Sequence, residues 1–187
     1  MGVRRVLQRW NERLRKRAGF TLVEVLAVTS IMTGLASNGN NFAACKDKAN
    51  QTVCKNNLMQ IHRALMMFLM DNESYPQAWF FPPDKHPYRE QYNIANILKS
   101  YTGAPQLFIC PTACQELQQR KITYLWNDQL NNKGQDSLPN PTETWVMEDI
   151  NAVTNKVPPS HDTGYNVLFG DGHVKFLAGP PQLRPAG

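Results

Sequence analysis

An apolar run near the N-terminus, residues 20–36, constrains this chain more than any other feature, because Glu24 is its only charged side chain. As a helix, these 17 residues would extend about 26 Å, slightly less than the roughly 30 Å hydrocarbon core of a bilayer. The run lacks the amphipathic periodicity of a helix on a protein surface. We therefore predict a membrane-spanning helix. A buried core helix is the alternative that this length leaves open.

The positive charge of the chain is concentrated in the 19 residues before this run. These residues have a net charge of +6, with Glu12 as their only acid, whereas the whole 187-residue chain carries +5, so the part from Phe20 onward carries −1. The basic residues are Arg4, Arg5, Arg9, Arg13, Arg15, Lys16 and Arg17. A basic flank predicts a cytoplasmic N-terminus. The nearly neutral remainder gives no electrostatic reason to expect nucleic acid as a partner.

The junction between the basic block and the apolar run has a specific pattern. Gly19 immediately precedes Phe20, and Glu24 follows Phe20 by four residues. This junction resembles the processing site of the type IV pilin and pseudopilin family. The resemblance implies that a prepilin peptidase cuts between Gly19 and Phe20 and that Phe20 becomes N-methylated. A secretory signal peptide would instead be cut after the run, where residues 37–41 offer a weaker match.

The position of Glu24 has a physical explanation in this interpretation. An unpaired carboxylate in a membrane helix costs about 2.5 to 3.5 kcal/mol. Cleavage creates an α-amine on Phe20, and in the family this amine is thought to pair with the glutamate of a neighbouring subunit in a helical filament. The resemblance therefore makes Glu24 the assembly charge. A solvated carboxylate near the membrane interface is the alternative.

A second helix is predicted over residues 46–71, where apolar side chains recur at steps of three and four. These side chains are Val53, Cys54, Leu58, Ile61, Leu65, Phe68 and Leu69. Pro76 limits the helix, because the residue before a proline is pushed out of helical geometry. Residues 37–41 contain Gly and Asn, which have low helix propensity, and so predict an interruption between the two helices.

The remainder is predicted to be a small head domain. A short helix is expected over 94–101 and strands over 122–126, 144–149, 165–169 and 173–177, the last two joined by the hairpin signal Gly170-Asp171-Gly172. A long helix packed on a small antiparallel sheet is an α+β fold, and the resemblance makes it pilin-like. The predicted segments are a leader (1–19), a membrane or filament-core helix (20–36), a stalk break and amphipathic helix (37–76), an α+β periplasmic head (77–179) and a loose tail (180–187).

Nine residues separate His161 from Asp171-Gly172. In a chain with this N-terminus, the spacing resembles the H-X9-DG domain associated with prepilin-type processing. We predict a structural role, in which Asp171 caps backbone amides of the turn and His161 hydrogen-bonds the same turn. Metal binding is the alternative. Its candidate ligands are His161, Asp162, Asp171 and His173 for a zinc-type site, and Asp149, Asp162 and Asp171 for calcium.

Four cysteines, Cys45, Cys54, Cys110 and Cys114, follow the apolar run. In the oxidising periplasm that this topology implies, they predict two disulfides, with three connectivities open. A zinc site formed by all four thiolates is the alternative.

The aromatic loop over residues 78–92 is the remaining candidate surface. Trp79, Phe80 and Phe81 are predicted to cover a small core, with a ligand-contact patch as the alternative.

These features together predict a structural protein rather than an enzyme, with no catalytic residue and no cofactor. Its expected partners are the prepilin peptidase, other pilin or pseudopilin subunits of a type IV pilus or type II secretion filament, and the inner membrane. It is expected to cross that membrane once, with the head periplasmic, and to join the filament after assembly. A binding module or adhesin displayed on such a filament is the first alternative, and a membrane-anchored metalloenzyme is the second.

Overall fold

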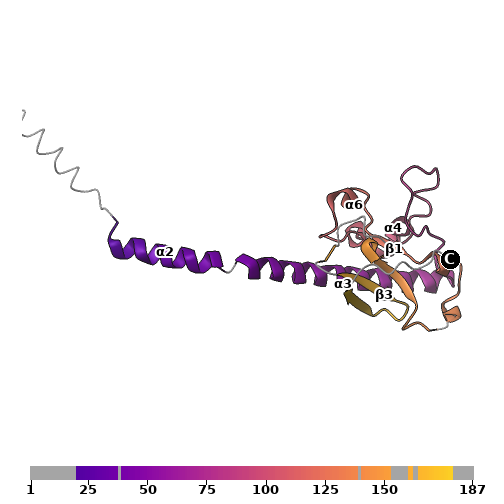
Figure 1. Ribbon diagram of the computed structural model, residues 1–187. Coiled ribbons are helices and arrows are strands. Elements are labelled where there is room, and N and C mark those ends of the chain that lie inside the picture. The colour runs from indigo at the N-terminus through magenta and orange to yellow at the C-terminus, as the bar shows by residue number, and fades with distance from the viewer. Residues whose placement is uncertain (1–19, 38, 139, 153–159, 162–163, 179–187) are drawn as a thin grey trace, which may run out of the picture. The chain divides into compact units, whose positions relative to one another are not determined.

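The computed structural model describes residues 20–37, 39–138, 140–152, 160–161 and 164–178. The expected leader, the tail after residue 179 and Asp162 lie outside these ranges. The chain divides into two compact units, residues 1–44 and 45–187, which are described separately here (Figure 1).

The first unit contains helix α2, Leu22–Ser37. Its apolar side chains face outward: Phe20 is 82% exposed, Leu22 79% and Ile31 62%. Within its own unit, the helix has no core that covers these side chains. Within the described residues, no helix combines the length and the apolarity needed to cross a bilayer.

Helix α3, Gly39–Asn72, begins two positions after the end of α2. Residue 38, which lies between the two helices, is outside the described residues, and residues 39–41 of the expected interruption are helical. The predicted helix over 46–71 is confirmed as the larger part of α3, which ends before Glu73, a residue with a positive φ of 60°.

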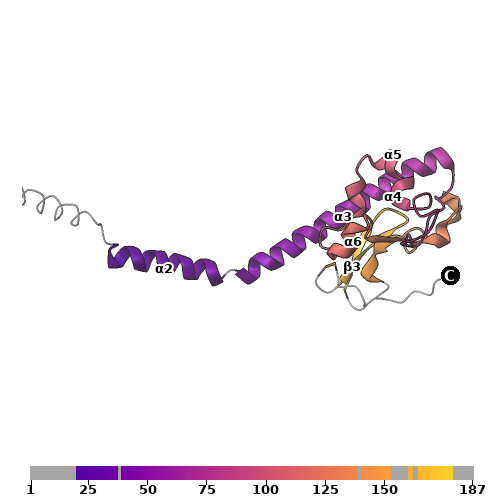
Figure 2. The same ribbon diagram turned by 90° about the horizontal axis from the view of Figure 1, so that it is seen from above.

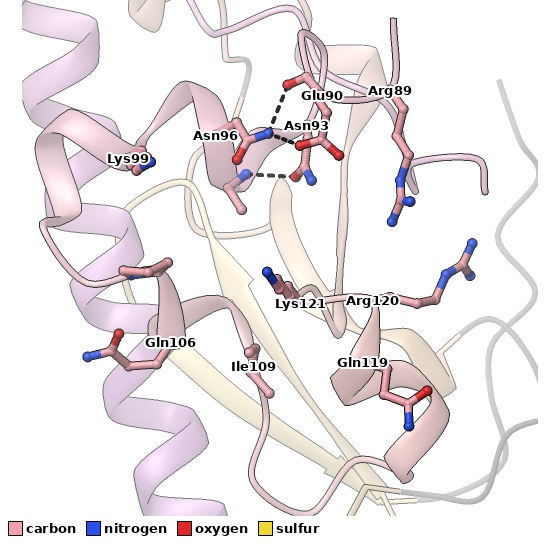
Figure 3. Close-up of a pocket in the computed structure, with 12 residues that line it drawn as sticks. Arg89, Glu90, Asn93, Asn96, Lys99, Gln106, Ile109, Gln119, Arg120 and Lys121 are labelled. Atoms are coloured by element: carbon pink, nitrogen blue, oxygen red, sulfur yellow. Dashed lines mark hydrogen bonds between the residues drawn. The ribbon is translucent and has the colours of Figure 1, made fainter. Parts of the chain in front are cut away.

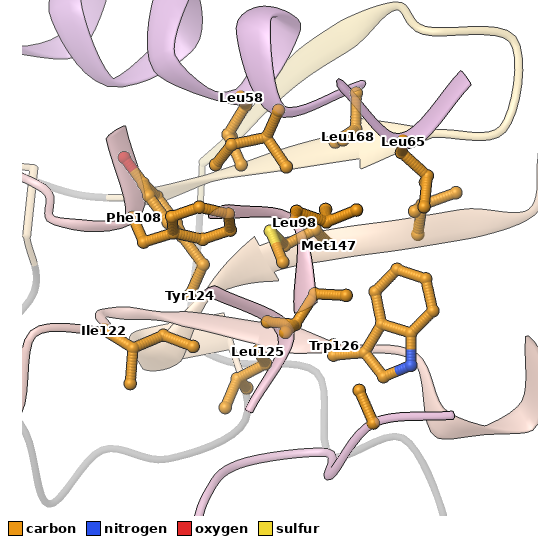
Figure 4. Packing of buried hydrophobic residues seen from close by; sticks show 14 of the residues in the cluster. Leu58, Leu65, Leu98, Phe108, Ile122, Tyr124, Leu125, Trp126, Met147 and Leu168 are labelled. Atoms are coloured by element: carbon orange, nitrogen blue, oxygen red, sulfur yellow. The ribbon is translucent and has the colours of Figure 1, made fainter. Parts of the chain in front are cut away.

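One face of α3 forms a wall of the head core in the second unit. Cys54, Leu58, Ile61, Leu65 and Leu69 are at most 3% exposed and recur every three or four residues. Figure 4 shows Leu58 and Leu65 packed over Phe108, Met147, Leu168 and Trp126. The predicted core face is confirmed except at Val53, whose side chain points outward.

A four-stranded antiparallel sheet, in the order β1-β2-β3-β4, lies against α3 (Figures 1 and 2). Its strands are β1 Tyr124–Trp126, β2 Trp145–Asp149, β3 Gly164–Phe169 and β4 Val174–Ala178. Alternate residues of a strand face opposite sides of the sheet. Leu168 accordingly joins the main core, while Tyr165 and Val167 join a second cluster with Ala152. The predicted α+β, pilin-like arrangement and its strands are confirmed.

Short helices complete the head: α4 Ile94–Ile97, α5 Lys99–Thr102 and α6 Gln115–Gln119. The 3-10 helices are η1 Pro105–Phe108, η2 Asp128–Leu130, η3 Gln135–Ser137 and η4 Ile150–Ala152. The single helix predicted over 94–101 is therefore two consecutive short helices.

Candidate functional site

The N-terminus of α2 is closed by a reciprocal hydrogen-bond pattern between Thr21 and Glu24. The Glu24 carboxylate accepts hydrogen bonds from the Thr21 backbone N–H (2.8 Å) and hydroxyl (2.9 Å), and the Glu24 N–H donates to the Thr21 hydroxyl (3.2 Å). This is a capping box, in which a threonine and a glutamate three residues later satisfy otherwise unpaired amides. The signal Thr-Leu-Val-Glu was readable in the sequence, but its capping role was missed.

The Glu24 carboxylate, the charge expected to act in assembly, is exposed. Its hydrogen-bond partner is Thr21 of the same chain. Phe20, which the expected cut would make the first residue, directly precedes Thr21 and is also exposed. Gly19 lies outside the described residues. The ammonium group of another chain could reach Glu24 from solvent, and it would compete there only with hydrogen bonds from Thr21.

A buried cluster of thiols, an imidazole and a carboxylate lies between α3 and the sheet. Cys54 comes from α3, Cys110 from the segment after η1, Asp149 from the end of β2, and His161 from just before β3; each is at most 1% exposed. The two Sγ atoms are 2.6 Å apart. The His161 Nε2 atom lies 3.5 Å from the Cys110 Sγ and 3.9 Å from the Asp149 Oδ2.

The chemistry of this cluster is limited by its geometry. Within the described residues, Cys54, Cys110 and His161 form the group whose donor atoms lie close enough to share a metal ion, all within 4.8 Å. Two thiolates on one tetrahedral zinc, with Zn–S bonds near 2.3 Å, would be about 3.8 Å apart. The sulfur separation of 2.6 Å is closer to the roughly 2.05 Å of a disulfide bond. Cys45 and Cys114 are not part of the group, so the structure does not form the four-thiolate zinc site.

All four cysteines are free thiols in this structure, and the pair forms a strongly polarised contact. A hydrogen bond from the Cys54 thiol, helped by His161 and Thr112, lowers the pKa of Cys110 to about 4. The same contact raises the pKa of Cys54, since its proton is held between two sulfurs. A lowered pKa favours the thiolate form of Cys110, and the thiolate is the reactive form in thiol–disulfide exchange.

Asp149 is the carboxylate most strongly perturbed by burial. Its Oδ2 atom accepts hydrogen bonds from the Asn166 backbone N–H (2.7 Å) and side-chain amide (3.1 Å), whereas its Oδ1 atom is buried without a hydrogen-bond partner in the described part of the chain. Desolvation raises the pKa of Asp149 to about 7, an effect that Cys110 reinforces and Asn166 opposes.

This perturbation predicts a pH-dependent stability. The unfolded carboxyl releases its proton near pH 3.8 and the folded one near 7, so the folded state binds more protons in between. Asp149 should therefore contribute a fall of a few kcal/mol in the free energy of unfolding as pH rises from about 4 to about 7. In the reduced protein Cys110, whose pKa is lowered, contributes a slope of opposite sign to wild type and variant alike. This contribution is measured by urea unfolding of the wild type and an Asp149→Asn variant at several pH values between about 4 and 7.

The difference between the two pH profiles isolates Asp149. His62, whose pKa burial lowers, contributes a slope of opposite sign in both proteins. Equal slopes in wild type and variant would contradict the prediction.

The turn between β3 and β4 contains Asp171 and Gly172, the second half of the spacing singled out in the sequence. Asp171 Oδ1 accepts hydrogen bonds from the His173 backbone N–H (3.1 Å) and lies 2.6 Å from its ring Nδ1, which confirms the expected capping by Asp171. Gly172 has a φ of 89°, and a Cβ there would lie 2.6 Å from the ring of His62. A residue without a side chain is required at this position.

The structure brings His62 of α3, not His161, to this turn: its Nε2 atom lies 3.2 Å from the Gly170 carbonyl oxygen. The prediction that His161 bonds the turn is therefore wrong. His161 precedes β3 and Asp171 follows it, so a six-residue strand, about 20 Å long, separates them. For the same reason, the zinc-type set of His161, Asp171 and His173 and the calcium set of Asp149 and Asp171 do not converge. Asp162 lies outside the described residues.

The aromatic loop serves mainly to cover the core. Phe80 and Phe81 are partly buried and pack against the main cluster. Trp79 makes edge contacts with the rings of His86 and Tyr92. The predicted core-covering role is confirmed for the two phenylalanines.

A cavity of about 630 Å³ lies beside this loop (Figure 3). The residues that form its lining share no sequence motif, so the cavity could not be predicted from the sequence. Its charged lining residues are Arg89, Glu90, Lys99, Arg120 and Lys121, and its amide residues are Asn93, Asn96, Gln106 and Gln119.

Comparison with known proteins finds partial similarity to type II secretion system core protein G. The chain is 38% identical over 66 residues to the protein of Vibrio cholerae, which covers 35% of this chain and 45% of that protein. It is 31% identical over 93 residues to the Pseudomonas aeruginosa protein, 49% of this chain and 57% of that one. It is 38% identical over 63 residues to the Aeromonas hydrophila protein, which covers 33% of this chain and 44% of that protein.

The chain thus spans about half the length of the curated relatives it matches. No family model matches it, and no solved structure matches it. The similarity is distant and covers part of the chain.

Proposed function

We propose that this chain is a pseudopilin-like subunit of a type II secretion or type IV pilus filament. In this proposal a prepilin peptidase cuts between Gly19 and Phe20, Phe20 is N-methylated, and residues 20–36 hold the subunit in the inner membrane before assembly. The head is periplasmic and has a structural role. Glu24 then pairs with the terminal amine of a neighbouring subunit.

The pattern of Gly19, Phe20 and Glu24 at the start of an exposed apolar helix carries this proposal. An apolar helix with outward-facing side chains requires lipid or other subunits to cover it. The helix-on-sheet fold and the similarity to core protein G support the same conclusion.

Intact-mass and N-terminal peptide analysis of the membrane-isolated protein tests the cut. We expect a chain that begins at Phe20 and carries one added methyl group. A matched Gly19→Val variant should keep the leader, because Gly19 is part of the pattern that resembles the processing site. An intact Met1 in the wild type, or a cut near Asn40, would contradict the proposal.

We further propose a disulfide between Cys54 and Cys110, one of the pairings that the sequence left open. The Cys110 thiolate attacks a disulfide of an oxidant of the thiol–disulfide exchange class. Cys54 then displaces that oxidant as its dithiol, so the two cysteines lose two electrons and two protons in total. The bond would tie α3 to the segment after η1. A second bond between Cys45 and Cys114 stays a prediction.

A further inference from the structure

His161 lies beside two groups that compete for one of its ring nitrogens. Its Nε2 atom is 3.5 Å from the Cys110 Sγ and 3.9 Å from the Asp149 Oδ2. Its other ring nitrogen, Nδ1, is 3.4 Å from the Thr112 hydroxyl oxygen. An imidazole N–H points well at one acceptor at a time. With both thiols of the pair free, as they are in this structure, the Nε2 atom is closer to the sulfur than to the carboxylate.

Burial limits the net charge that this cluster can carry. Its four ionisable side chains, Cys54, Cys110, Asp149 and His161, are each at most 1% exposed. A buried charge without a partner is unstable, so the charges of such a group should sum to zero. When Cys110 is a thiolate and His161 an imidazolium, Asp149 must therefore keep its proton. The proton belongs on Oδ1, because Oδ2 accepts two hydrogen bonds from Asn166.

Formation of the disulfide changes this balance, because it removes the negative charge of Cys110. The two sulfurs would approach from 2.6 Å to about 2.05 Å. An uncharged sulfur is only a weak hydrogen-bond acceptor. Asp149 is then the group of the cluster that can balance a positively charged His161. Its two hydrogen bonds from Asn166 favour the ionised carboxylate.

We propose that when the disulfide closes, the His161 Nε2–H group changes its acceptor from Cys110 to Asp149, and Asp149 releases its proton. The proposal rests on the Cys54–Cys110 disulfide proposed above, and it makes His161 and Asp149 positioning residues for that bond. The cluster changes from a thiol, a thiolate, an imidazolium and a carboxylic acid to a disulfide, an imidazolium and a carboxylate. Both states are neutral.

Electrons and protons balance in this step. The sulfur–sulfur bond forms as the Cys54 S–H bond breaks, and two electrons pass to the disulfide of the oxidant. Two protons leave the cluster, one from Cys54 and one from Asp149, and they convert the oxidant to its dithiol. Asp149 therefore holds, in the reduced head, the proton that an ionised Cys110 has given up.

The other groups that face the cluster do not replace Asp149 in this role. Burial raises the pKa of Tyr124, on β1, well above its usual value, so its hydroxyl stays neutral in both states. Asp47 of α3 also acts on His161, but it is only half-buried, and water screens its charge. Burial lowers the pKa of His161, yet Cys110 and Asp149 more than offset this effect, so the imidazolium is favoured.

The exchange couples two connections within the head. Asp149 ends β2 and His161 precedes β3, so their ion pair joins these segments in the oxidised state. The disulfide joins α3 to the segment after η1. One oxidation event would thus fix both pairs of segments, and the bond is a redox-sensitive switch and more than a passive crosslink.

Infrared difference spectroscopy of the full chain in detergent tests the proposal. The chain is oxidised with glutathione disulfide or reduced with dithiothreitol at about pH 6, where exposed carboxyl groups are ionised. We expect reduction to produce the carbonyl band of one protonated carboxylic acid, which shifts in heavy water. Asp149→Asn should lose this band, because it has no carboxyl group. His161→Gln should also lose it, because Asp149 without a cationic partner stays protonated in both states. Asp128→Asn, an exposed residue of η2, should keep the band.

The outcomes separate this inference from the disulfide on which it rests. A wild-type spectrum without the band, in a sample whose peptide map contains the Cys54–Cys110 bond, would overturn the exchange and leave the disulfide intact. A band that persists in Asp149→Asn or in His161→Gln would overturn the exchange as well. A chain that forms no such bond with glutathione disulfide would overturn both proposals.

Discussion

Replacement of Glu24 by Leu is expected to abolish filament assembly while leaving the leader cleavable. In a packed filament the terminal ammonium of each subunit would then lie near an apolar side chain instead of a carboxylate. Removing one partner of a buried ion pair costs about 3 to 5 kcal/mol, because the other charge stays uncompensated. Such a loss weakens each subunit contact by a factor of about 100 to 4,000. Counting filaments by electron microscopy in cells that express the assembly machinery measures it.

The capping box provides the matched control for this experiment. Glu24 both carries the charge and caps α2 through Thr21, so a leucine removes two functions at once. Glu24→Gln keeps a capping side chain but removes the charge, and should also fail to assemble. Thr21→Ala keeps the charge and loses the cap, at a cost of about 1 kcal/mol, and should still form filaments. Filaments formed by Glu24→Gln at wild-type levels would show that the charge is dispensable.

Replacement of Cys54 by Ser is expected to lower the melting temperature of the oxidised protein by about 10 °C. The proposed bond closes a loop between positions 56 residues apart, for which the chain-entropy relation gives about 4 kcal/mol. For a domain of this size, each kcal/mol corresponds to about 2 to 4 °C. Thermal unfolding followed by circular dichroism, with and without reductant, measures the shift.

The second cysteine and the reductant test the same bond in independent ways. Cys110→Ser, the double variant and reduced wild type should all melt close to Cys54→Ser, since one bond can be lost only once. Lys55→Ser, a serine substitution at an exposed position of α3, is the control and should unfold as wild type does. Non-reducing peptide mapping should recover a Cys54–Cys110 linked pair. Stoichiometric zinc that disappears in Cys54→Ser would contradict the disulfide.

Local sequence patterns were enough to predict most of the fold. The buried face of α3 from Cys54 to Leu69 follows helical periodicity, and the strands around Gly170-Asp171-Gly172 follow alternation and turn chemistry. These signals come from neighbouring residues, which is why they can be read without coordinates. The exceptions were also local. The predicted helix over 94–101 is divided at Leu98, and the capping role of Glu24 was readable but overlooked.

The sequence by itself determined the helix-on-sheet architecture and carries the Gly19, Phe20 and Glu24 pattern on which the proposed processing depends. Both depend on residues that are close along the chain. Only the tertiary structure decided which groups meet across it. It placed His161 beside Cys54, Cys110 and Asp149. It also brought the His62 ring to the turn that contains Asp171, and it brought the basic residues of the cavity together from separate segments. Contacts between positions 50 or more residues apart, such as Cys54 with Cys110, depend on how the elements pack, and no local pattern encodes that packing.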